Sequence, residues 1–597
     1  MAPAGPPFLG VERSLTGRRW RSRLADERLG LALAQRLDVP EVVGRVLAGR
    51  GVGPDDGEAF LDPTLKRWLP DPSELRDMDV ACARLEAAVR GGETVAVFGD
   101  YDVDGATSAA LIARFLAAVG GRSRIYVPDR VEEGYGPNLP ALLRLKEEGA
   151  DLVVTVDCGT TAFGPLAGAA EAGLEVVVVD HHLAGPGLPQ ARAVVNPNRL
   201  DGPDGLGQLA AVGVAFLLIV GVNRALRRGG WYGQERPEPD LRRWLDLVAL
   251  GTVCDVVPLT GVNRALVRRG LEVMGRRLNP GLAALADVAR LDRPPNAYHA
   301  GYVLGPRINA GGRVGRPDLG ARLLATDDAD EARRLAEELD ALNRERRAIE
   351  AEVQEAAIAA VEADTGAAAP AVLALAAGHG WHPGVIGIVA GRLKERYRRP
   401  ALVVSVTDGI GKGSGRSLPG VDLGAAVTAA RQEGLLIDGG GHAMAAGLTV
   451  AEDRLAALAE FLDERLGPAV EEARAADGLG FDGALTAGAA TVELATVLER
   501  AGPFGAGNPE PRFAVAFARV VAADTVGDSH VRCVLADRGG GRLKAIAFRA
   551  REGALGPALL DHGGRTLHVA GHVRREHWRG REEVRLFVDD AALPGPA

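Results

Sequence analysis

Apolar residues along this chain fall into two patterns, short β-branched runs and longer stretches with helical spacing. From about residue 80 to 260 the two alternate, which predicts parallel strands joined by crossover helices, as in an α/β domain. Buried helices are expected at 111–118 and at 241–250, the second ending at Gly251. The strand runs are apolar at nearly every position, as in strands covered on both faces, and lie at 95–98, 152–156 and 176–179.

The middle of the chain contains one long stretch without Gly or Pro. Residues 327–362 are rich in Ala, Glu, Arg and Leu, with apolar residues at helical spacing, which predicts one long connecting helix or two nearly continuous ones. Its apolar heptads are not sustained, so a coiled-coil dimer is disfavoured and a monomer is expected. Beyond it, strand-like residues at 371–375 and 401–406, a glycine-rich turn and a helix near 452–466 predict a second, smaller α/β unit.

The last part of the chain follows a Gly- and Pro-rich break at 502–509. Five short strand-like runs with polar turns predict a small β-barrel of the OB type; they lie at 513–522, 530–536, 542–548, 566–575 and 583–590. The N-terminal part has helical stretches between Pro-rich breaks. The expected organisation is an N-terminal segment (1–75), an α/β domain (76–326), a connecting long helix (327–365), a smaller α/β domain (366–470), and linker helices with the barrel (471–597).

Composition excludes several classes of protein. The 597 residues are 47% apolar and 25% charged, as in ordinary globular proteins, and the length predicts several domains. No run of about 18 apolar residues predicts a membrane span, and the N-terminus lacks the layout of a signal peptide. The four cysteines are far apart and form no CxxC pair, so neither a disulfide framework nor a zinc site is expected. These features predict a cytoplasmic protein with no membrane association.

Charge is distributed unevenly along the chain. The whole chain carries −9, whereas residues 511–597 hold 14 Arg and Lys against 10 Asp and Glu, a net +4. The rest of the chain therefore carries −13. A basic module attached to an acidic body fits an accessory domain that binds a polyanion.

The chemistry of the first α/β domain lies where its predicted strands end. Three short acidic motifs, at 100–104, 157–159 and 180–182, each follow one of the apolar runs. Carboxylates and imidazoles are costly to bury without partners. Ligand sites of open parallel sheets lie at the carboxyl ends of the strands. The three motifs are therefore expected to meet in one crevice.

The residue types in this crevice predict a metal site. Asp102 and Asp104 lie two apart in one glycine-containing loop, so both can face a pair of cations, and Asp157 can bridge two ions with its two oxygens. His181 adds a nitrogen and Asp255 a further carboxylate. Four carboxylates and one imidazole suit Mn²⁺ better than Zn²⁺, with Mg²⁺ as a competitor.

Asp180 and His182 are left to orient His181 or to contact the substrate. A lone Asp-x-Asp is usually a turn and a lone His-His is usually structural, but three acidic motifs at three strand ends favour metal binding. Paired ions about 3.5–4 Å apart serve phosphoryl chemistry, because they generate hydroxide and neutralise charge during in-line attack. The expected reaction is hydrolysis of a phosphoester or phosphoanhydride. The sequence contains no Walker P-loop, so a nucleotide-driven motor is not expected.

Four motifs resemble, in order, those of the DHH phosphoesterase superfamily: DYDVDG at 100–105, DCG at 157–159, DHH at 180–182 and CDVVP at 254–258. The resemblance implies five metal ligands, Asp102, Asp104, Asp157, His181 and Asp255. It also implies that His182 assists catalysis or binds the scissile phosphate, and with Asp180 and Asp157 it makes up the expected catalytic set. Some members have a histidine ligand four residues before the position of Asp102. This chain has Phe98 there, and Asp100 is a further candidate ligand.

Candidate phosphate-binding residues lie in later segments. The motif at 304–313 either grips phosphate with its arginines or forms an arginine-rich hinge between the domains. Residues 411–417 and a triple glycine at 439–441, which is expected to open a helix, suit an anion cradle. Together with 380–387 these two segments resemble the DHHA1 domain that follows DHH domains. The residues concerned are Arg307, Asn309, Arg313, Trp381, His382, Ser414, Arg416, Gly440, Gly441 and His442.

The connecting helix, the 306–313 motif and the barrel make residues 75–595 resemble the RecJ family, single-strand-specific DNA exonucleases acting 5′ to 3′. The resemblance implies a metal-dependent enzyme that releases 5′ mononucleotides from single-stranded DNA in repair and recombination. Single-strand-binding protein and a helicase are the expected partners. The second domain would hold the 5′ phosphate, and the barrel would stack bases and follow the backbone. Barrel candidates are Arg574, Arg575, Trp578, Arg579 and Arg581. The alternative role for Trp578 is packing at the tip of a hairpin.

Other functions stay open. A nano-RNase, a bisphosphate nucleotidase or a cyclic-dinucleotide phosphodiesterase of the same superfamily would use the same acidic motifs. These enzymes need no barrel, so the last 90 or so residues count against them. A replication scaffold that has lost its catalytic residues is also disfavoured, because every proposed ligand is present.

Overall fold

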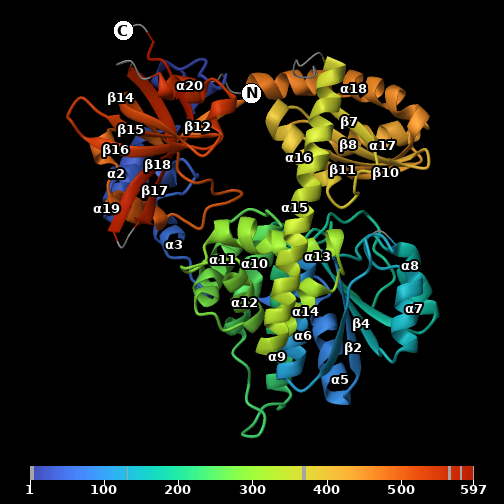
Figure 1. The fold of residues 1–597 in the computed structure, drawn as a ribbon. Helices are drawn as coiled ribbons and strands as arrows, with labels where there is room; N and C mark the ends of the chain where they lie inside the picture. Colours follow the sequence, from blue (N-terminus) through green and yellow to red (C-terminus); the bar gives the residue numbers. More distant parts are fainter. Residues whose placement is uncertain (1–5, 131, 366–371, 562–565, 579–580, 596–597) are drawn as a thin grey trace.

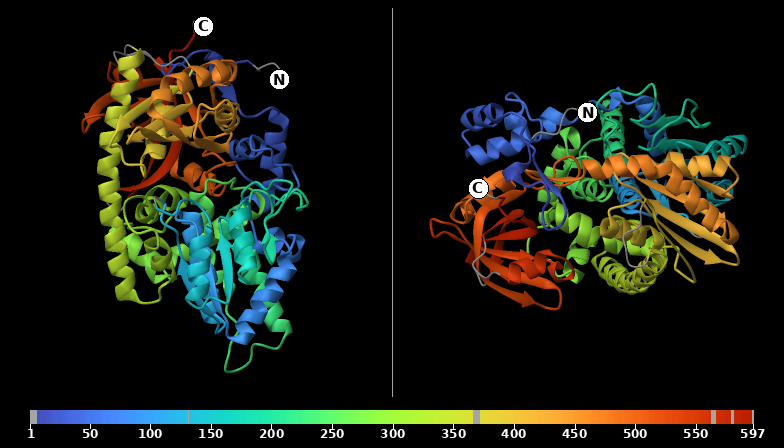
Figure 2. Two further views of the ribbon diagram at one scale, coloured as in Figure 1. Left: turned by 90° about the vertical axis from the view of Figure 1, so that its right-hand side faces the viewer. Right: turned by 90° about the horizontal axis from the view of Figure 1, so that it is seen from above.

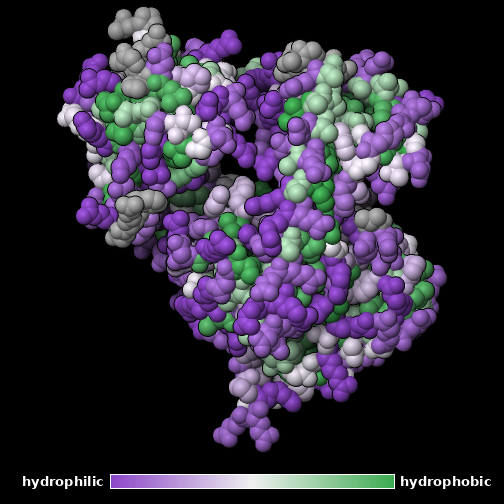
Figure 3. Space-filling view, viewed as in Figure 1, coloured by the Kyte–Doolittle hydropathy of each residue, from purple (hydrophilic) through white to green (hydrophobic). Residues whose placement is uncertain are grey.

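The computed structural model describes residues 6–130, 132–365, 372–561, 566–578 and 581–595. Three bodies are arranged around the centre of Figure 1: the DHH-like α/β domain below, the smaller α/β domain at the upper right and the β-barrel at the upper left. An opening between the barrel and the smaller domain is also visible in the space-filling view (Figure 3). The predicted fold class, two α/β units joined by a long helix and followed by a barrel, is confirmed.

The larger α/β domain is built on a fully parallel five-stranded sheet in the order β3-β2-β4-β5-β6. The apolar runs form β2, β4 and β5, which are direct neighbours although β3 separates β2 from β4 along the chain. Their carboxyl ends therefore meet at one edge. The strands are β2 (Thr94–Gly99), β3 (Arg122–Tyr126), β4 (Leu152–Val156), β5 (Glu175–Val179) and β6 (Ala193–Val195).

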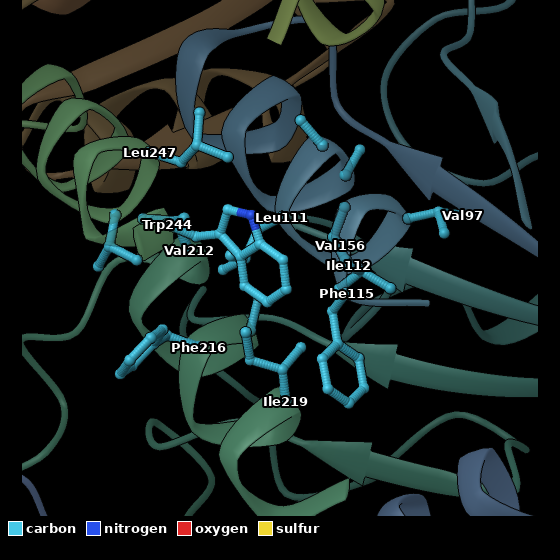
Figure 4. Close-up of a cluster of buried hydrophobic side chains, with 14 of the residues drawn as sticks. Val97, Leu111, Ile112, Phe115, Val156, Val212, Phe216, Ile219, Trp244 and Leu247 are labelled. Carbon is cyan, nitrogen blue, oxygen red and sulfur yellow. The ribbon is translucent and has the colours of Figure 1, made fainter. Parts of the chain in front are cut away.

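Helices cover both faces of this sheet, because alternate strand residues point to opposite sides. On one face Val97 and Val156 pack against Leu111, Phe115 and Phe216 in the cluster drawn in Figure 4. The opposite face carries α7 and α8. The helices of the first face include α5 (Met78–Gly91), α6 (Val103–Ala118), α9 (Ala211–Arg228) and α10 (Leu245–Cys254); those of the second are α7 (Leu139–Glu147) and α8 (Phe163–Glu171).

Helix α10 corrects one prediction. The helix was expected to end at Gly251, but it continues to Cys254, with Asp255 as its C-cap. Gly251 is needed for close packing: a Cβ there would lie 2.3 Å from Oγ1 of Thr107 and 2.9 Å from Oδ1 of Asp104 on α6. Glycine permits this approach, and Asp255 is carried to the sheet edge by a helix.

The chain then adds helices that lead to the connector. They are α11 (Gly261–Gly275), α12 (Pro280–Val288), the π-helix η4 (His299–Leu304), α13 (Gly305–Val314) and α14 (Leu319–Ala325). The motif at 304–313 is therefore a helix of the larger domain and not a hinge. Gly312 supplies the expected close backbone approach, since a Cβ would lie 2.9 Å from the carbonyl oxygen of Tyr101.

The predicted connecting helix is confirmed as α15 (Ala329–Thr365). Leu335 and Leu339 in its first half belong to the core of the larger domain, whereas Val353 and Val361 belong to the core of the smaller one. Figure 2 shows α15 running along one side of the molecule past both α/β domains. One continuous helix thus holds the two domains together.

The smaller domain has a five-stranded sheet in the order β10-β11-β9-β8-β7, in which only β7 and β8 are parallel. The triple glycine was predicted to open a helix, and that prediction is wrong. It lies in the edge strand β10, paired with β11. Helix α17 covers β10 so closely that a Cβ at Gly424 would lie 2.8 Å from the Gly441 carbonyl carbon. The elements are β7 (Ala374–His379), α16 (Ile386–Tyr397), β8 (Ala401–Thr407), β9 (Ile410–Arg416), α17 (Leu423–Gln432), β10 (Asp438–His442), β11 (Ala445–Ala451) and α18 (Leu455–Ala476).

The C-terminal sheet closes on itself as a barrel, in the order β13-β14-β15-β16-β18-β17 with β14 also paired to β17. All five predicted strands are present, and a short β13 is added. The elements are β13 (Gly483–Leu485), α19 (Val492–Glu499), β14 (Phe513–Val526), β15 (His530–Ala536), β16 (Arg542–Ala547), α20 (Leu555–Leu560), β17 (Thr566–Trp578) and β18 (Arg581–Ala592).

The N-terminal segment packs on the barrel. Strand β1 (Arg19–Ser22) pairs in parallel with β12 (Gly478–Phe481), and α2 (Glu41–Ala48) contributes Val43 and Val46 to the barrel core. Figure 2 shows these N-terminal helices beside the barrel strands. Two further short helices, α3 (Gly57–Leu61) and α4 (Leu65–Trp68), follow α1 (Glu27–Leu37) and α2. Within the described residues, no helix has both the length and the apolar character to cross a membrane.

Candidate metal centre and phosphate pocket

The acidic motifs converge at the carboxyl edge of the parallel sheet. Ligand atoms of Asp100, Asp102 and Asp157 lie within 4.8 Å of one another, and so do those of Asp104, His181 and Asp255. Nε2 of His181 is 3.3 Å from Oδ1 of Asp157 and 3.6 Å from Oδ2 of Asp255. The two groups are therefore neighbours and share one pocket, as the strand-end motifs predict.

The local backbone aims each carboxylate into this pocket. Asp102 is the N-cap of α6, where one oxygen accepts a 3.0 Å hydrogen bond from the Gly105 amide. Asp104 is buried on α6 and accepts hydrogen bonds of 2.7 and 2.9 Å from the amides of Ala211 and Val212 at the start of α9. Helix N-termini favour negative charge, so α9 stabilises the ionised form of this carboxylate.

Two positions beside the pocket have strained backbone. Asp157 has φ +61°, and Val256, which follows Asp255, also has φ +61° with 70% of its surface exposed. A positive φ is a genuine outlier for a β-branched residue, and such strain concentrates at functional sites. At both positions the strain lies in or next to a proposed metal ligand.

The electrostatics of the pocket fit a cation. Burial and the charges of neighbouring carboxylates raise the pKa of Asp104 to about 7 and that of Asp255 to about 9. The same causes raise the pKa of Asp100 and Asp157. Oδ1 of Asp100 and Oδ2 of Asp255 are buried without a hydrogen-bond partner. Unpaired buried oxygens among repelling carboxylates are the donor set that a divalent cation would neutralise.

His182 lies at the rim of the pocket with Asp180 behind it. Nδ1 of His182 is 2.7 Å from Oδ1 of buried Asp180, which also accepts hydrogen bonds from the Thr160 and His181 amides. Burial lowers the pKa of His182. The hydrogen bond to Asp180 and the charge of that carboxylate raise the pKa, and together they outweigh burial, so the pKa lies above its ordinary value. Asn196 donates a 2.8 Å hydrogen bond to the His182 carbonyl and fixes the motif from below.

Tyr135 is a pocket residue that the sequence analysis missed. Its hydroxyl donates to the Asp157 carbonyl at 3.0 Å and lies 3.4 Å from both ring nitrogens of His182. The flanking Gly134 and Gly136 both have positive φ, which makes a tight loop that presents the ring. The Gly-Tyr-Gly pattern was the available signal for this residue.

A cluster of arginines faces the acidic pocket. Burial first, and then the charges of Arg130, Arg346 and Arg416, lower the pKa of Arg313 to about 10. The guanidinium of Arg130 lies over the Tyr101 ring, 5.2 Å from its centroid. Arg130 and Arg346 were not among the predicted residues, because nothing in their local sequence sets them apart from the many surface arginines.

The arginine cluster meets the N-terminus of α16 in the smaller domain. Nη1 of Arg416 donates a 3.1 Å hydrogen bond to Oγ of Ser414. A Cβ at Gly387, in the first turn of α16, would lie 2.9 Å from both Nη2 of Arg416 and Oγ of Ser414. A helix N-terminus, a hydroxyl and guanidinium groups together make an anion pocket. Ser414 and Arg416, two of the residues predicted to form an anion cradle, therefore lie beside the start of α16, whereas the triple glycine of that prediction lies in strand β10.

The other predicted phosphate residues have different surroundings. Arg307 is held by Asp340 on α15 and by the Val303 carbonyl, at 2.9 and 2.7 Å. Asn309 lies one turn before Arg313 on α13, on the same helix face. These observations separate Arg307, which ties α13 to α15, from Arg313, which reaches the arginine cluster.

The loop before α16 holds two more of the predicted residues. Nδ1 of His382 accepts a 3.0 Å hydrogen bond from the Gly384 amide, and the Trp381 ring packs into the core of the smaller domain. Gly440 and Gly441 lie on the edge strand β10 with His442, which is exposed. Nδ1 of His442 accepts a 3.3 Å hydrogen bond from the Met444 amide. The first segment borders the pocket, because the Gly384 carbonyl accepts a hydrogen bond from Arg313, whereas β11 separates β10 from the strand that carries Arg416.

Of the barrel candidates, Arg574 and Arg575 are already paired with carboxylates. Arg574 makes two hydrogen bonds to Glu510, and Arg575 bonds to Glu499 and Glu582. Arg581 is exposed at the start of β18. Arg579 lies outside the described residues, and only the backbone of Trp578 is described.

The fold and the pocket define a DHH-type protein with an attached DHHA1 domain. Residues 94–252 match the family described as "DHH family, N-terminal domain", residues 369–467 match "DHHA1 domain", and residues 481–590 match "RecJ OB domain". The chain belongs to the RecJ family. It is 38% identical over 92% of its length to a single-stranded-DNA-specific exonuclease RecJ of Dickeya dadantii, of which 96% is covered.

Other relatives agree with this assignment. The chain is 37% identical to the Escherichia coli RecJ exonuclease, over 93% of this chain and 96% of the relative. Among solved structures, RecJ of Thermus thermophilus in complex with Mn²⁺ matches this chain with a TM-score of 0.77 and 30% identity. The match covers 96% of this chain and 79% of the Thermus thermophilus chain. The same protein in complex with Mg²⁺ has a TM-score of 0.70.

Proposed function

We propose that this protein is a single-stranded-DNA-specific exonuclease that hydrolyses phosphodiester bonds from the 5′ end and releases 5′ mononucleotides. The observation that carries the proposal is the pairing of two sites. An acidic pocket in the DHH domain faces an arginine pocket shared with the DHHA1 domain, and α15 joins the two. The RecJ relatives, whose names specify single-stranded DNA, support the substrate.

The acidic pocket would hold two divalent cations, Mn²⁺ or Mg²⁺. The carboxylates of Asp102, Asp104, Asp157 and Asp255 with His181 would be the ligands, and Asp100 a further one. Such ions supply a hydroxide near neutral pH and neutralise the charge that develops during in-line displacement. Oxygen-rich sites with one imidazole suit both metals, and RecJ of Thermus thermophilus has been solved with each.

His182 and Asp180 would work together beside this centre. Asp180 holds the imidazole through Nδ1, so that Nε2 faces the pocket with a proton to donate. A protonated Nε2 can bind a nonbridging oxygen of the scissile phosphate or protonate the leaving oxygen. Tyr135, bonded to the Asp157 carbonyl, closes the opposite side of the imidazole.

The arginine pocket would select the end of the strand. Arg313 and Arg416, with Ser414 and the α16 N-terminus, would grip a terminal 5′ phosphate. The next phosphodiester would then lie in the acidic pocket, so each cycle would release one 5′ mononucleotide. DHH and DHHA1 touch at Arg313 and Gly384, and a passage between them too narrow for a duplex would restrict the enzyme to single strands.

Digestion of 5′- and 3′-labelled single strands and matched duplexes with Mn²⁺ or Mg²⁺ tests this function. We expect the 5′ label to be released first, as a mononucleotide, and duplexes and metal-free reactions to give none. Release from 3′ ends alone would refute the polarity. Preference for dinucleotides over long strands would favour a small-nucleotide phosphodiesterase of the same superfamily, although the barrel argues against that function.

The cellular setting is part of the same proposal. An enzyme that degrades single strands from 5′ ends would serve DNA repair and recombination in the cytoplasm. It would act as a monomer, fed by a helicase and by single-strand-binding protein. Gel filtration and pull-down of these two partners test the last points, and a stable dimer or no retention of either partner would contradict them.

A further inference from the structure

Two tyrosines lie exposed side by side on the DHH domain. Tyr298 and Tyr302 expose 58% and 69% of their surfaces, and their rings stack with centroids 5.2 Å apart and 25° between planes. Tyr302 lies in η4, the π-helix that leads into α13, and Tyr298 is its N-cap. π-Helical turns are rare and frequently mark functional sites. Only 4% of the chain is aromatic, so two aromatic rings stacked on the surface indicate a site where a ligand binds.

The turn that carries the pair is rigidly held next to the acidic pocket. His299, between the two tyrosines, is buried and exchanges hydrogen bonds of 3.1 Å with Asn296. The Ala300 carbonyl accepts a 3.5 Å hydrogen bond from Sγ of Cys254, the residue immediately before Asp255. The tyrosines are therefore fixed against the helix end that delivers Asp255 to the proposed metal centre.

The barrel carries a second group of rings. The Arg574 guanidinium lies 4.5 Å from the centroid of the Phe587 ring, and Phe587 is 5.9 Å from Phe548. Phe548 is 54% exposed and lies 5.0 Å from the His530 ring. The barrel touches the DHH domain beside the end of α10: the Leu259 amide donates a 2.8 Å hydrogen bond to the Ala506 carbonyl, and a Cβ at Gly507 would lie 3.0 Å from Cβ of Pro258. Glu510, which accepts two hydrogen bonds from Arg574, follows this contact loop along the chain.

We propose that Tyr302, Tyr298, Arg574, Phe587 and Phe548 form a base-stacking track that guides a single strand from the barrel to the acidic pocket. Successive bases would stack on the tyrosine pair and on the barrel rings, with the guanidinium between them. Rings alternating with a cation suit single-stranded nucleic acid without sequence preference. The inference rests on the proposed function, because it presumes that a single strand occupies the pocket.

Binding without catalysis tests the track directly. Single strands with 2-aminopurine placed one position at a time would be titrated with the full-length protein in EDTA. With wild type we expect fluorescence quenching at a few adjacent positions of the strand. In Tyr298→Ala and in Tyr302→Ala this quenching should be lost, and the Kd should be about ten-fold weaker for each ring removed. Tyr298→Phe and Tyr302→Phe keep the ring and should quench and bind like wild type. Leu278→Ala, an exposed apolar position between α11 and α12, is the surface control.

Substrate length separates this inference from the proposed function. A 5′-phosphorylated dinucleotide occupies the two pockets alone, so its hydrolysis should be the same in the tyrosine variants and in wild type. Long strands should show a raised KM in those variants with an unchanged kcat. Alanine variants that quench and bind long strands like wild type would overturn the track. A wild-type protein that degrades no single strand would instead overturn the proposed function.

Discussion

Nη1 of Arg313, on α13 of the DHH domain, donates a 2.9 Å hydrogen bond to the carbonyl oxygen of Gly384 in the DHHA1 domain. The contact is close at the backbone as well, since a Cβ at Gly384 would lie 2.4 Å from the Arg313 carbonyl oxygen. The two domains therefore meet at the arginine pocket itself. Their separation there would set how far a phosphate bound as proposed lies from the acidic pocket.

Arg416→Met should remove the preference for 5′-phosphorylated strands. Hydrogen bonds to charged groups contribute about 1.5–3 kcal/mol, so KM for a phosphorylated strand should rise roughly 10- to 150-fold. KM for a 5′-hydroxyl strand should hardly change. Arg431→Met, an exposed arginine of the same domain that pairs with Asp438, is the matched control. An equal loss on both substrates would contradict the assignment of the pocket.

Asp157→Asn should abolish hydrolysis and stabilise the metal-free protein. It removes one of several buried carboxylates that raise one another's pKa, so repulsion in the pocket falls. We expect activity to fall by about 100-fold or more. In EDTA at pH 8, Tm should rise above that of wild type, and added Mn²⁺ should raise it less than in wild type. A variant with normal Mn²⁺ stabilisation would show that Asp157 is not a ligand.

Asp180→Asn should lower kcat and leave KM nearly unchanged. The carboxylate holds His182 through Nδ1 at 2.7 Å and does not reach the pocket interior itself. Losing such an orienting partner typically costs about 10- to 100-fold. Asparagine has a single acceptor oxygen, so it can keep the His181 hydrogen bond only by losing the one that Thr160 donates to the other oxygen. Thermal unfolding measures the cost of that loss separately from the change in kcat. A change confined to KM would place His182 in ground-state substrate binding only.

Asp246→Asn should stabilise the protein above pH 6. Asp246 is buried on α10, and desolvation raises its pKa to about 6. The folded state then binds more protons than the unfolded state between about pH 4 and 6, so the stability of the wild type falls as pH rises through that window. Asparagine carries no charge and so avoids this cost. The free energy of unfolding should therefore be about 2–3 kcal/mol higher than in wild type at pH 8, and the difference should shrink towards pH 4. Urea unfolding at both pH values measures it, and a pH-independent gain would contradict the assignment.

Asp482→Ala should destabilise the barrel and its N-terminal segment together. The fully buried carboxylate accepts hydrogen bonds of 2.7 Å from Arg23 and 2.9 Å from the Arg512 amide, and it also pairs with buried Arg50. Leaving buried guanidinium groups without their carboxylate partner costs about 3–5 kcal/mol of unfolding free energy. Asp477→Ala breaks only exposed pairs, with Arg18 and Arg398, and should cost less than about 1 kcal/mol. Equal unfolding free energies for the two variants would show that the Asp482 network is not stabilising.

The strand-end motifs could be identified from the sequence because their placement is local. A buried parallel strand is an apolar run, and the residues after it must lie at the carboxyl edge of the sheet. Asp102, Asp157 and His181 therefore meet whatever the rest of the chain does. The long helix and the barrel strands were predictable for the same reason, since their periodicity lies within single elements.

The residues that complete the pockets depend on contacts between distant segments. The α16 N-terminus and Arg416 reach Arg313 only because α15 holds the two domains face to face. Arg130 joins them from the loop after β3 and Arg346 from α15 itself. The triple glycine pairs as a strand because a hairpin partner was available in β11. Glycine has no local preference that distinguishes a helix start from an edge strand, so packing decided between them.

The sequence by itself determined that acidic groups gather at one sheet edge, because periodicity and chain direction place them there. Only the tertiary structure decided which arginines oppose them. It also decided that Gly251 brings α10 against α6, and that the N-terminal segment packs on the barrel. Those choices depend on side-chain volume and charge across the fold, and neighbours along the chain do not specify them.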